Sequence, residues 1–123
     1  MAQRAGLLVK RGTELSFLPA ASVRCLAPSS RLSQIPWDTA RMALVGGEVV
    51  PVLELGDATG VLVLCEVRGQ TVALSGLAPE QVGFWTETEQ GVSVHGVNVP
   101  LLDLDAALTQ FRHQLQPSKE SPA

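Results

Sequence analysis

Short apolar runs separated by glycine turns constrain the fold of this chain more than any other feature. The clearest case is ALVGGEVVPVLELG at residues 43–56, where two apolar runs flank Gly46-Gly47. Glycine adopts positive φ without steric cost, so a glycine pair between apolar runs predicts a tight β-hairpin. Similar turns recur at 11–14, 68–70 and 95–96. This pattern predicts a mainly β protein built from small barrels or sandwiches rather than a βαβ fold.

The remaining segments are read from turn and helix signals. Residues 7–10 and 14–18 are the first two expected strands, joined by the glycine turn between them. A proline on each side of residues 20–26 predicts a short helix or turn there, and the polar stretch 29–39 reads as a surface connection. Pro79 similarly predicts one helical turn in LAPEQVGFW.

The strand that follows Gly47 is apolar on both faces. Side chains alternate along a strand, so one face carries Val49, Pro51, Leu53 and Leu55, and the other carries Val50, Val52 and Glu54. Such a strand is either enclosed within the protein or exposes one face to a partner. Proline lacks a backbone donor, so Pro51 favours an edge strand or a bulge.

Near the C-terminus the apolar period changes from two to between three and four. The spacing predicts an amphipathic helix over 103–115, capped by Asp103 or Asp105, with an apolar face formed by Leu101, Leu104, Leu108, Phe111 and Leu115. We expect one domain over 5–115, with halves 5–56 and 60–103 each forming a barrel. The tail 116–123 has a composition typical of disorder.

No residue set in the sequence predicts catalysis, a metal site or a cofactor. His95 and His113 are isolated, and Cys25 and Cys65 lack the spacing of metal ligands. The formal charge of −3, with scattered basic residues, argues against nucleic-acid binding. The sequence contains no long apolar run that would insert into a membrane, and the two isolated cysteines suit the cytoplasm. The surplus of apolar strand instead favours a protein-binding module.

The order of these segments resembles the CheW-like domain of bacterial chemosensory adaptors. The corresponding stretches are GLLVKRGTELSFLPAASV, QIPWDTARMALVGGEVVPVLEL, GVLVLCEVRGQTVALSGLAPEQVG and VNVPLLDLDAAL. The most specific pieces are VVPVLEL and LLDLDAAL. The chain also resembles, in its general character, the short accessory CheW-like protein of the myxobacterial Frz chemosensory system.

This resemblance implies two SH3-like β-barrel subdomains and a non-catalytic adaptor role without a cofactor. The implied partners are the cytoplasmic helices of a chemoreceptor, a CheA-type histidine kinase and other CheW-like proteins. By the same resemblance, the protein-binding residues lie around the glycine turn and along the strand that follows it. They are Ile35, Pro36, Val45, Gly46, Gly47, Val50, Pro51, Val52 and Glu54.

The chain departs from the family pattern in three ways. Leu44-Val45-Gly46-Gly47 replaces Asn-Leu-Arg-Gly, and Glu54-Leu55-Gly56 replaces Asp-Leu-Arg, so two arginines that can clamp carboxylates are missing. The chain is also shorter after Leu55 and between Trp85 and Val97. Three alternatives therefore stay open: an adaptor that docks on the receptor and couples it to the kinase or not, a module that binds the kinase or another CheW-like domain without receptor contact, and a small-barrel ligand-binding protein or enzyme.

Overall fold

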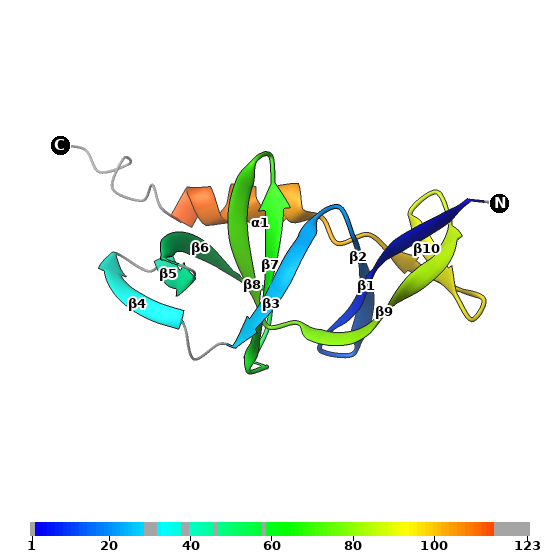
Figure 1. Cartoon of the computed structure of the whole chain (residues 1–123), viewed down its shortest axis with the longest axis horizontal. Helices are drawn as coiled ribbons and strands as arrows, with labels where there is room; N and C mark the ends of the chain where they lie inside the picture. The colour runs from blue at the N-terminus through cyan, green and yellow to red at the C-terminus, as the bar shows by residue number, and fades with distance from the viewer. Residues whose placement is uncertain (1, 29–31, 38–39, 46, 58, 115–123) are drawn as a thin grey trace.

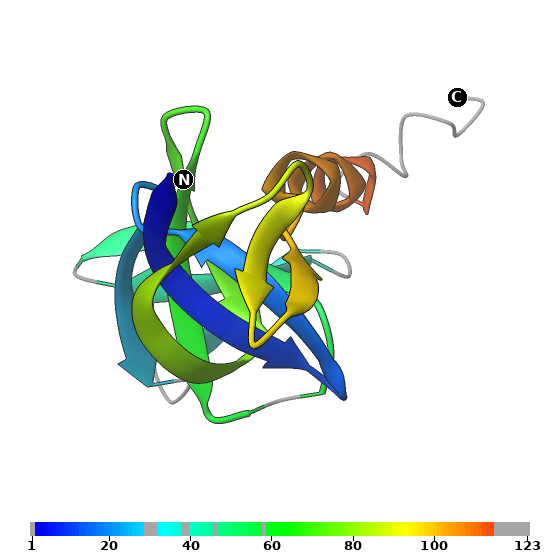
Figure 2. The ribbon, with the colours of Figure 1, turned by 90° about the vertical axis from the view of Figure 1, so that its right-hand side faces the viewer.

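The computed structural model describes residues 2–28, 32–37, 40–45, 47–57 and 59–114, with side chains in the same ranges except 32–37, 40–41 and 112–114. Within this part of the chain, strands alternate with turns and a helix, α1 (Leu104–Gln114), follows the last strand. The strands form two curled sheets side by side, and α1 lies over one of them (Figures 1 and 2). The mainly β prediction is confirmed.

The first sheet joins the two ends of the chain. In spatial order it contains β11 (Val97–Pro100), β10 (Gly91–Val94), β9 (Ala78–Glu87), β1 (Gln3–Arg11) and β2 (Glu14–Pro19). The peptide N–H of Leu102 donates to the carbonyl of Phe17 at 3.0 Å, which brings the chain after β11 back to β2. The sheet therefore curls around an apolar cluster that includes Leu8, Phe17 and Val99.

The second sheet is built from the middle of the chain. Its spatial order is β3 (Val23–Pro28), β7 (Val61–Val67), β8 (Gln70–Ser75), β6 (Glu48–Glu54), β5 (Ala40–Val45) and β4 (Leu32–Trp37). The sheets therefore do not follow the predicted halves 5–56 and 60–103. β9 pairs with β1 of the N-terminal hairpin, which gives β1 a second partner for its backbone groups, and β10 and β11 extend the sheet from β9.

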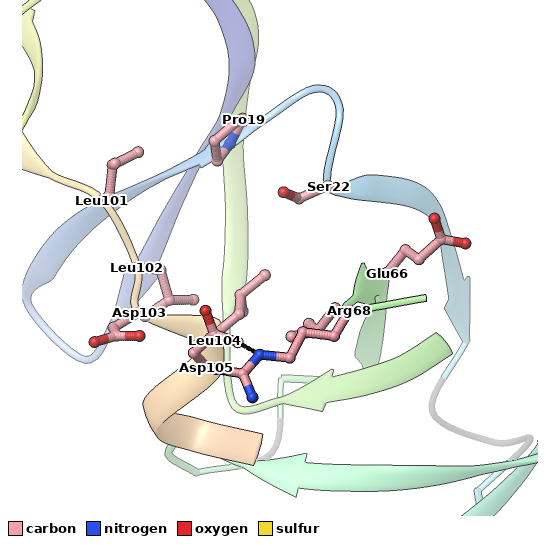
Figure 3. A pocket seen from close by; sticks show the side chains of 10 residues that line it. Pro19, Ser22, Glu66, Arg68, Leu101, Leu102, Asp103, Leu104 and Asp105 are labelled. Atoms are coloured by element: carbon pink, nitrogen blue, oxygen red, sulfur yellow. Dashed lines mark ion pairs between the residues drawn. The ribbon is translucent and has the colours of Figure 1, made fainter. Parts of the chain in front are cut away.

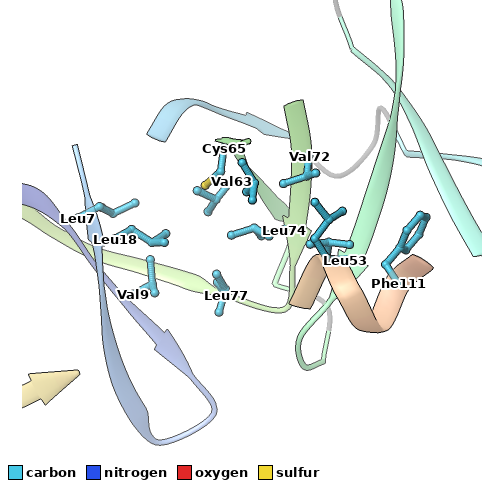
Figure 4. Packing of buried hydrophobic residues seen from close by; sticks show 12 residues of the cluster. Leu7, Val9, Leu18, Leu53, Val63, Cys65, Val72, Leu74, Leu77 and Phe111 are labelled. Atoms are coloured by element: carbon cyan, nitrogen blue, oxygen red, sulfur yellow. The ribbon is translucent and has the colours of Figure 1, made fainter. Parts of the chain in front are cut away.

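Two apolar clusters lie on opposite faces of the second sheet. One fills the interior of its curl and contains Val50, Val52, Leu62 and Leu64. The other lies between the two sheets and α1, as Figure 4 shows. It contains Leu7, Val9, Leu18, Leu53, Val63, Cys65, Val67, Val72, Leu74, Leu77, Leu108 and Phe111. Strands of the second sheet are apolar on both faces because each face contacts a different cluster.

The predicted hairpins are confirmed where a glycine turn joins neighbouring strands. Arg68 and Gly69 have φ of 51° and 78°, and His95 and Gly96 have φ of 49° and 80°. Positive φ at both central residues is the geometry of the tight turns that match the twist of antiparallel strands. These two turns connect β7 to β8 and β10 to β11.

Three expectations for individual segments are wrong in whole or in part. The short helix or turn expected over 20–26 is a turn at residues 20–22 alone, because β3 follows at once. The expected connection over 29–39 contains β4, an edge strand that pairs irregularly with β5. The expected helical turn at Pro79 is the start of β9, where a register shift leaves a bulge beside the proline. Bulges and edges tolerate proline, and one exposed helical turn buries too little apolar surface to compete.

Helix α1 confirms the predicted change of period. Leu108 and Phe111 are buried against the cluster between the sheets. The peptide N–H of Ala106 donates to Oδ1 of Asp103 at 3.0 Å, so Asp103 is the N-cap. Asp105 instead forms an ion pair with Arg68. The predicted residue 115 and tail 116–123 lie outside the described residues.

Candidate functional site

The described residues bring no set of catalytic side chains together. They contain no group of three or more His, Cys, Asp or Glu side chains placed to hold a metal ion. Burial raises the pKa of the Cys65 thiol to about 12, so this thiol is protonated at neutral pH and a poor nucleophile. Cys25 is exposed on β3, and His95 is exposed in the turn between β10 and β11.

The structure does not gather the predicted protein-binding residues on one surface. Val50 and Val52 are 3% and 2% exposed and belong to the interior of the second sheet. Pro51 is buried as well, whereas Gly47 and Glu54 are exposed. The prediction that one face of this strand is available to a partner is therefore wrong at Val50, Pro51 and Val52.

The other predicted residues occupy the β5–β6 hairpin and β4. Val45 is half-buried against the interior of the second sheet. Gly47 has φ of 84°, as expected for a glycine in the hairpin turn predicted at Gly46-Gly47. Gly46 itself lies outside the described residues. Ile35 and Pro36 fall in β4, where the structure describes the backbone alone.

Pro51 does not mark an edge strand, because β6 lies between β5 and β8. Counting from the hairpin turn, Pro51 faces Met42 in a pair that exchanges no backbone hydrogen bonds. Its nitrogen therefore faces β8, and the pairing of β6 with β8 begins only at the next residue, Val52. Pro51 lacks a backbone N–H, and at this position β8 offers no paired residue to accept a hydrogen bond from one.

A strongly apolar hollow of the described surface lies between the two sheets, beside the cluster of Figure 4. It has a volume of about 300 Å³ and is lined almost entirely by apolar atoms. We refer to it as the inter-sheet groove, and its lining residues are Ala5, Gly6, Leu7, Ala20, Val23, Leu26, Val82, Gly83 and Phe84. Leu26 on β3 is 50% exposed, and Val82 and Phe84 on β9 are 78% and 68% exposed.

Local geometry explains why these side chains remain outside. Val82 and Phe84 are two residues apart on a strand, so they share the face that turns away from the interior of the first sheet. Gly83 points to the opposite face and pairs with Gly6 on β1. A Cβ atom at Gly6 would lie 2.3 Å from the carbonyl oxygen of Leu18, so only glycine allows β2 to approach this closely.

A second, smaller apolar surface lies at the end of the β5–β6 hairpin. Leu44 and Val49 face each other across the two strands and are 50% and 55% exposed. They belong to a pair without mutual hydrogen bonds, in which side chains lie closest together. This pair is adjacent to the predicted binding residues Val45 and Gly47, so that part of the sequence prediction did locate exposed apolar side chains.

A hollow of about 510 Å³, lined by charged and apolar side chains alike, lies where the β7–β8 hairpin meets the start of α1 (Figure 3). Its charged groups are already engaged within the chain. Arg68 Nε lies 2.8 Å from Asp105 Oδ1, and Arg24 lies 3.9 Å from Glu66. Asp103 caps α1. We interpret this hollow as a junction that holds the helix against the hairpin.

Sequence reasoning missed the inter-sheet groove because Pro79 made the segment around Val82 read as a helical turn. The signal that could have revealed β9 is the two-residue alternation of Val82 and Phe84 with Gly83 and Trp85. Trp85 instead points inward, where its ring meets that of Phe17 edge-to-face with 6.0 Å between centroids.

Comparisons with known proteins support the fold. No family model matches the chain, and a search of curated proteins gave no match either. Among solved structures, the scaffolding protein TtCheW from Thermoanaerobacter tengcongensis is similar, with a TM-score of 0.58 and 17% sequence identity. The similarity covers 66% of this chain and 64% of that protein. The chain therefore has a CheW-like fold, mainly β, with two SH3-like subdomains and a C-terminal helix.

Proposed function

We propose that this protein is a non-catalytic adaptor of a bacterial chemosensory system, which works in the cytoplasm and binds the helical tip of a chemoreceptor. The observation that carries the proposal is the inter-sheet groove. Its three most exposed side chains, Leu26, Val82 and Phe84, project from two different sheets. The fold that carries them is similar to that of the scaffolding protein TtCheW. A short accessory protein of the Frz kind is the form of adaptor that suits the two shortened segments, after Leu55 and between Trp85 and Val97.

An amphipathic helix suits the groove because its apolar residues, three and four apart, form a stripe that an apolar hollow can receive. The missing arginines point the same way. Without guanidinium groups at positions 46 and 56, the chain has fewer forked donors for receptor carboxylates, so apolar contact must supply most of the affinity.

A matched pair of leucine variants tests this proposal. Leu26 in the groove and Leu44 on the β5–β6 hairpin are both 50% exposed. We expect Leu26→Glu to weaken binding of a receptor cytoplasmic helical fragment at least tenfold in calorimetry, because the carboxylate is desolvated against apolar atoms. Leu44→Glu is expected to leave this affinity within about twofold. The proposal fails if the wild-type protein does not bind the fragment, or if the two variants behave alike.

The hairpin pair Leu44 and Val49 supports a second contact, with another CheW-like domain such as that of a CheA-type kinase. Exposed apolar pairs on a strand face suit sheet-to-sheet packing. Val45 and Gly47 would adjoin this contact. Titration of the kinase's CheW-like domain separates the alternatives: Leu44→Glu is expected to abolish this binding while Leu26→Glu preserves it. An unchanged affinity in Leu44→Glu would remove the hairpin from the kinase contact.

A further inference from the structure

The outer edge of β9 lacks a strand partner over most of its length. β1 pairs with β9 from Ala78 to Thr86, but on the opposite edge β10 pairs only with Thr86 and Glu87. No other described strand pairs with that edge. Residues 81–85 therefore pair with β1 along one edge and have no strand partner along the other, which faces solvent.

The alternation of backbone hydrogen bonds along β9 identifies which residues direct their N–H and C=O groups toward this edge. The peptide N–H of Glu87 donates to the carbonyl of Ala2 at 2.9 Å, so Glu87 faces β1. Backbone groups alternate between the two edges of a strand, which makes Trp85 and Gly83 face β1 as well. Val82 and Phe84 consequently direct both N–H and C=O toward the unpaired edge.

These same two residues carry the most exposed large apolar side chains among the described residues. Native proteins protect sheet edges with charges, prolines or bulges. Here the bulge beside Pro79 protects only the start of β9, and the segment QVGFW at 81–85 contains no charge. An edge that offers free donors, free acceptors and apolar side chains together is suited to an added β-strand.

We propose that the added strand is β9 of a second copy of this chain, paired antiparallel around a two-fold axis at Gly83. In this register Val82 of each copy faces Phe84 of the other, and each such pair exchanges two backbone hydrogen bonds. Gly83 faces its own equivalent in the pair between them, where the two backbones approach most closely. The absence of a side chain there removes the main steric obstacle.

The segment's self-complementarity is what favours a second copy over a foreign strand. With the axis at Gly83, the pairing covers residues 81–85, because β10 already occupies this edge at Thr86 and Glu87. None of the paired residues is charged, so no like charges face each other, and Glu80 lies 4.0 Å from Lys10 of its own chain. The first sheets of the two copies then become one continuous sheet. The inter-sheet grooves of the two copies meet at the axis, because Val82 and Phe84 line the groove and also form the pairing edge.

Charge-swap variants test the register directly in sedimentation equilibrium of the full chain. We expect the wild-type protein to dimerise and V82K/F84K to weaken dimerisation at least tenfold, because each lysine then faces a lysine. V82K/F84E is expected to restore the dimer, with an affinity that falls as salt is added, because each lysine then faces a glutamate. Both positions are exposed, so circular dichroism should show an unchanged fold.

A backbone variant provides independent support. Phe84→Pro removes the outward N–H and leaves the hydrogen bonds to β1, whereas Phe84→Ala removes only the ring; we expect the proline variant to lose more dimer. A monomeric wild-type protein, a V82K/F84K dimer of undiminished strength, or a V82K/F84E variant as monomeric as V82K/F84K would each overturn the proposal. Leu26→Glu should remain dimeric, so failure of the receptor contact and failure of the dimer are separable.

Discussion

Two neighbouring valines provide the sharpest test of whether β6 is core or interface. Val49 is 55% exposed and Val50 is 3% exposed, although they are adjacent in the chain. Side chains alternate along a strand, so a shift of one residue in the register would exchange their environments. Truncating each valine to alanine therefore measures the register and the burial of β6 at once.

The expected magnitudes follow from the burial. Val50→Ala removes two methyl groups from the interior of the second sheet, worth about 1.6 kcal/mol of transfer free energy. The cavity left among Ala43, Leu62 and Leu64 raises the cost to about 2–3 kcal/mol. For a chain of this length, that loss lowers the melting temperature by roughly 8–12 °C. Val49→Ala should change the free energy of unfolding by less than about 0.5 kcal/mol.

Urea unfolding followed by circular dichroism measures both free energies, and the two variants should share the wild-type m-value. Val50→Asp extends the series, because a carboxylate without a partner in that cluster should prevent folding. Equal losses in the two alanine variants, or a larger loss in Val49→Ala, would refute the register of β6. If Val50 contacted a partner instead, Val50→Asp would fold with wild-type stability and fail to bind that partner.

Substitutions at three further residues test separate features of the structure. Because burial raises the pKa of Cys65 to about 12 from an ordinary value of 9.0, the unfolded chain ionises first, so stability should fall as pH rises through this interval. Urea titrations at pH values on either side of 9 should show this slope, and Cys65→Val should abolish it; exposed Cys25 should be alkylated much faster than Cys65 in the native protein. Asp103→Ala should cost about 1 kcal/mol of unfolding free energy and Asp103→Asn much less, because the cap accepts a hydrogen bond from the first helical turn. Gly76→Ala should lower the melting temperature markedly in calorimetry, since its φ is 90° and the added Cβ would lie 2.3 Å from the nitrogen of Gly56.

The correct sequence predictions concern local geometry. The turns at 68–69 and 95–96 require positive φ, and glycine at the second position of each supplies it. The helix α1 was predictable because its apolar period and its capping aspartate lie within a few residues of each other. In each case the deciding interaction connects residues that are close in the sequence.

The wrong predictions concern partners that are distant in the sequence. Nothing near β9 in the sequence shows that it pairs with β1, whose paired residues lie 68 to 83 positions earlier, so Pro79 decided the prediction. The division into halves failed for the same reason, because proximity in sequence was taken as proximity in space. The hairpin at 68–69 needed no such information.

The location of exposed apolar surface depends on how many strand partners each strand has. β6 reads as an interface because its sequence is apolar on both faces, yet it has a strand on each side and an apolar cluster on each face. β9 has fewer apolar residues, but the structure gives the segment 81–85 only one strand partner and leaves Val82 and Phe84 exposed. Apolar content alone therefore pointed to a strand whose Val50 and Val52 the fold buries. Apolar side chains stay exposed where the fold leaves part of a strand without a partner on one edge. Among the described strands, β9 is such a case at residues 81–85.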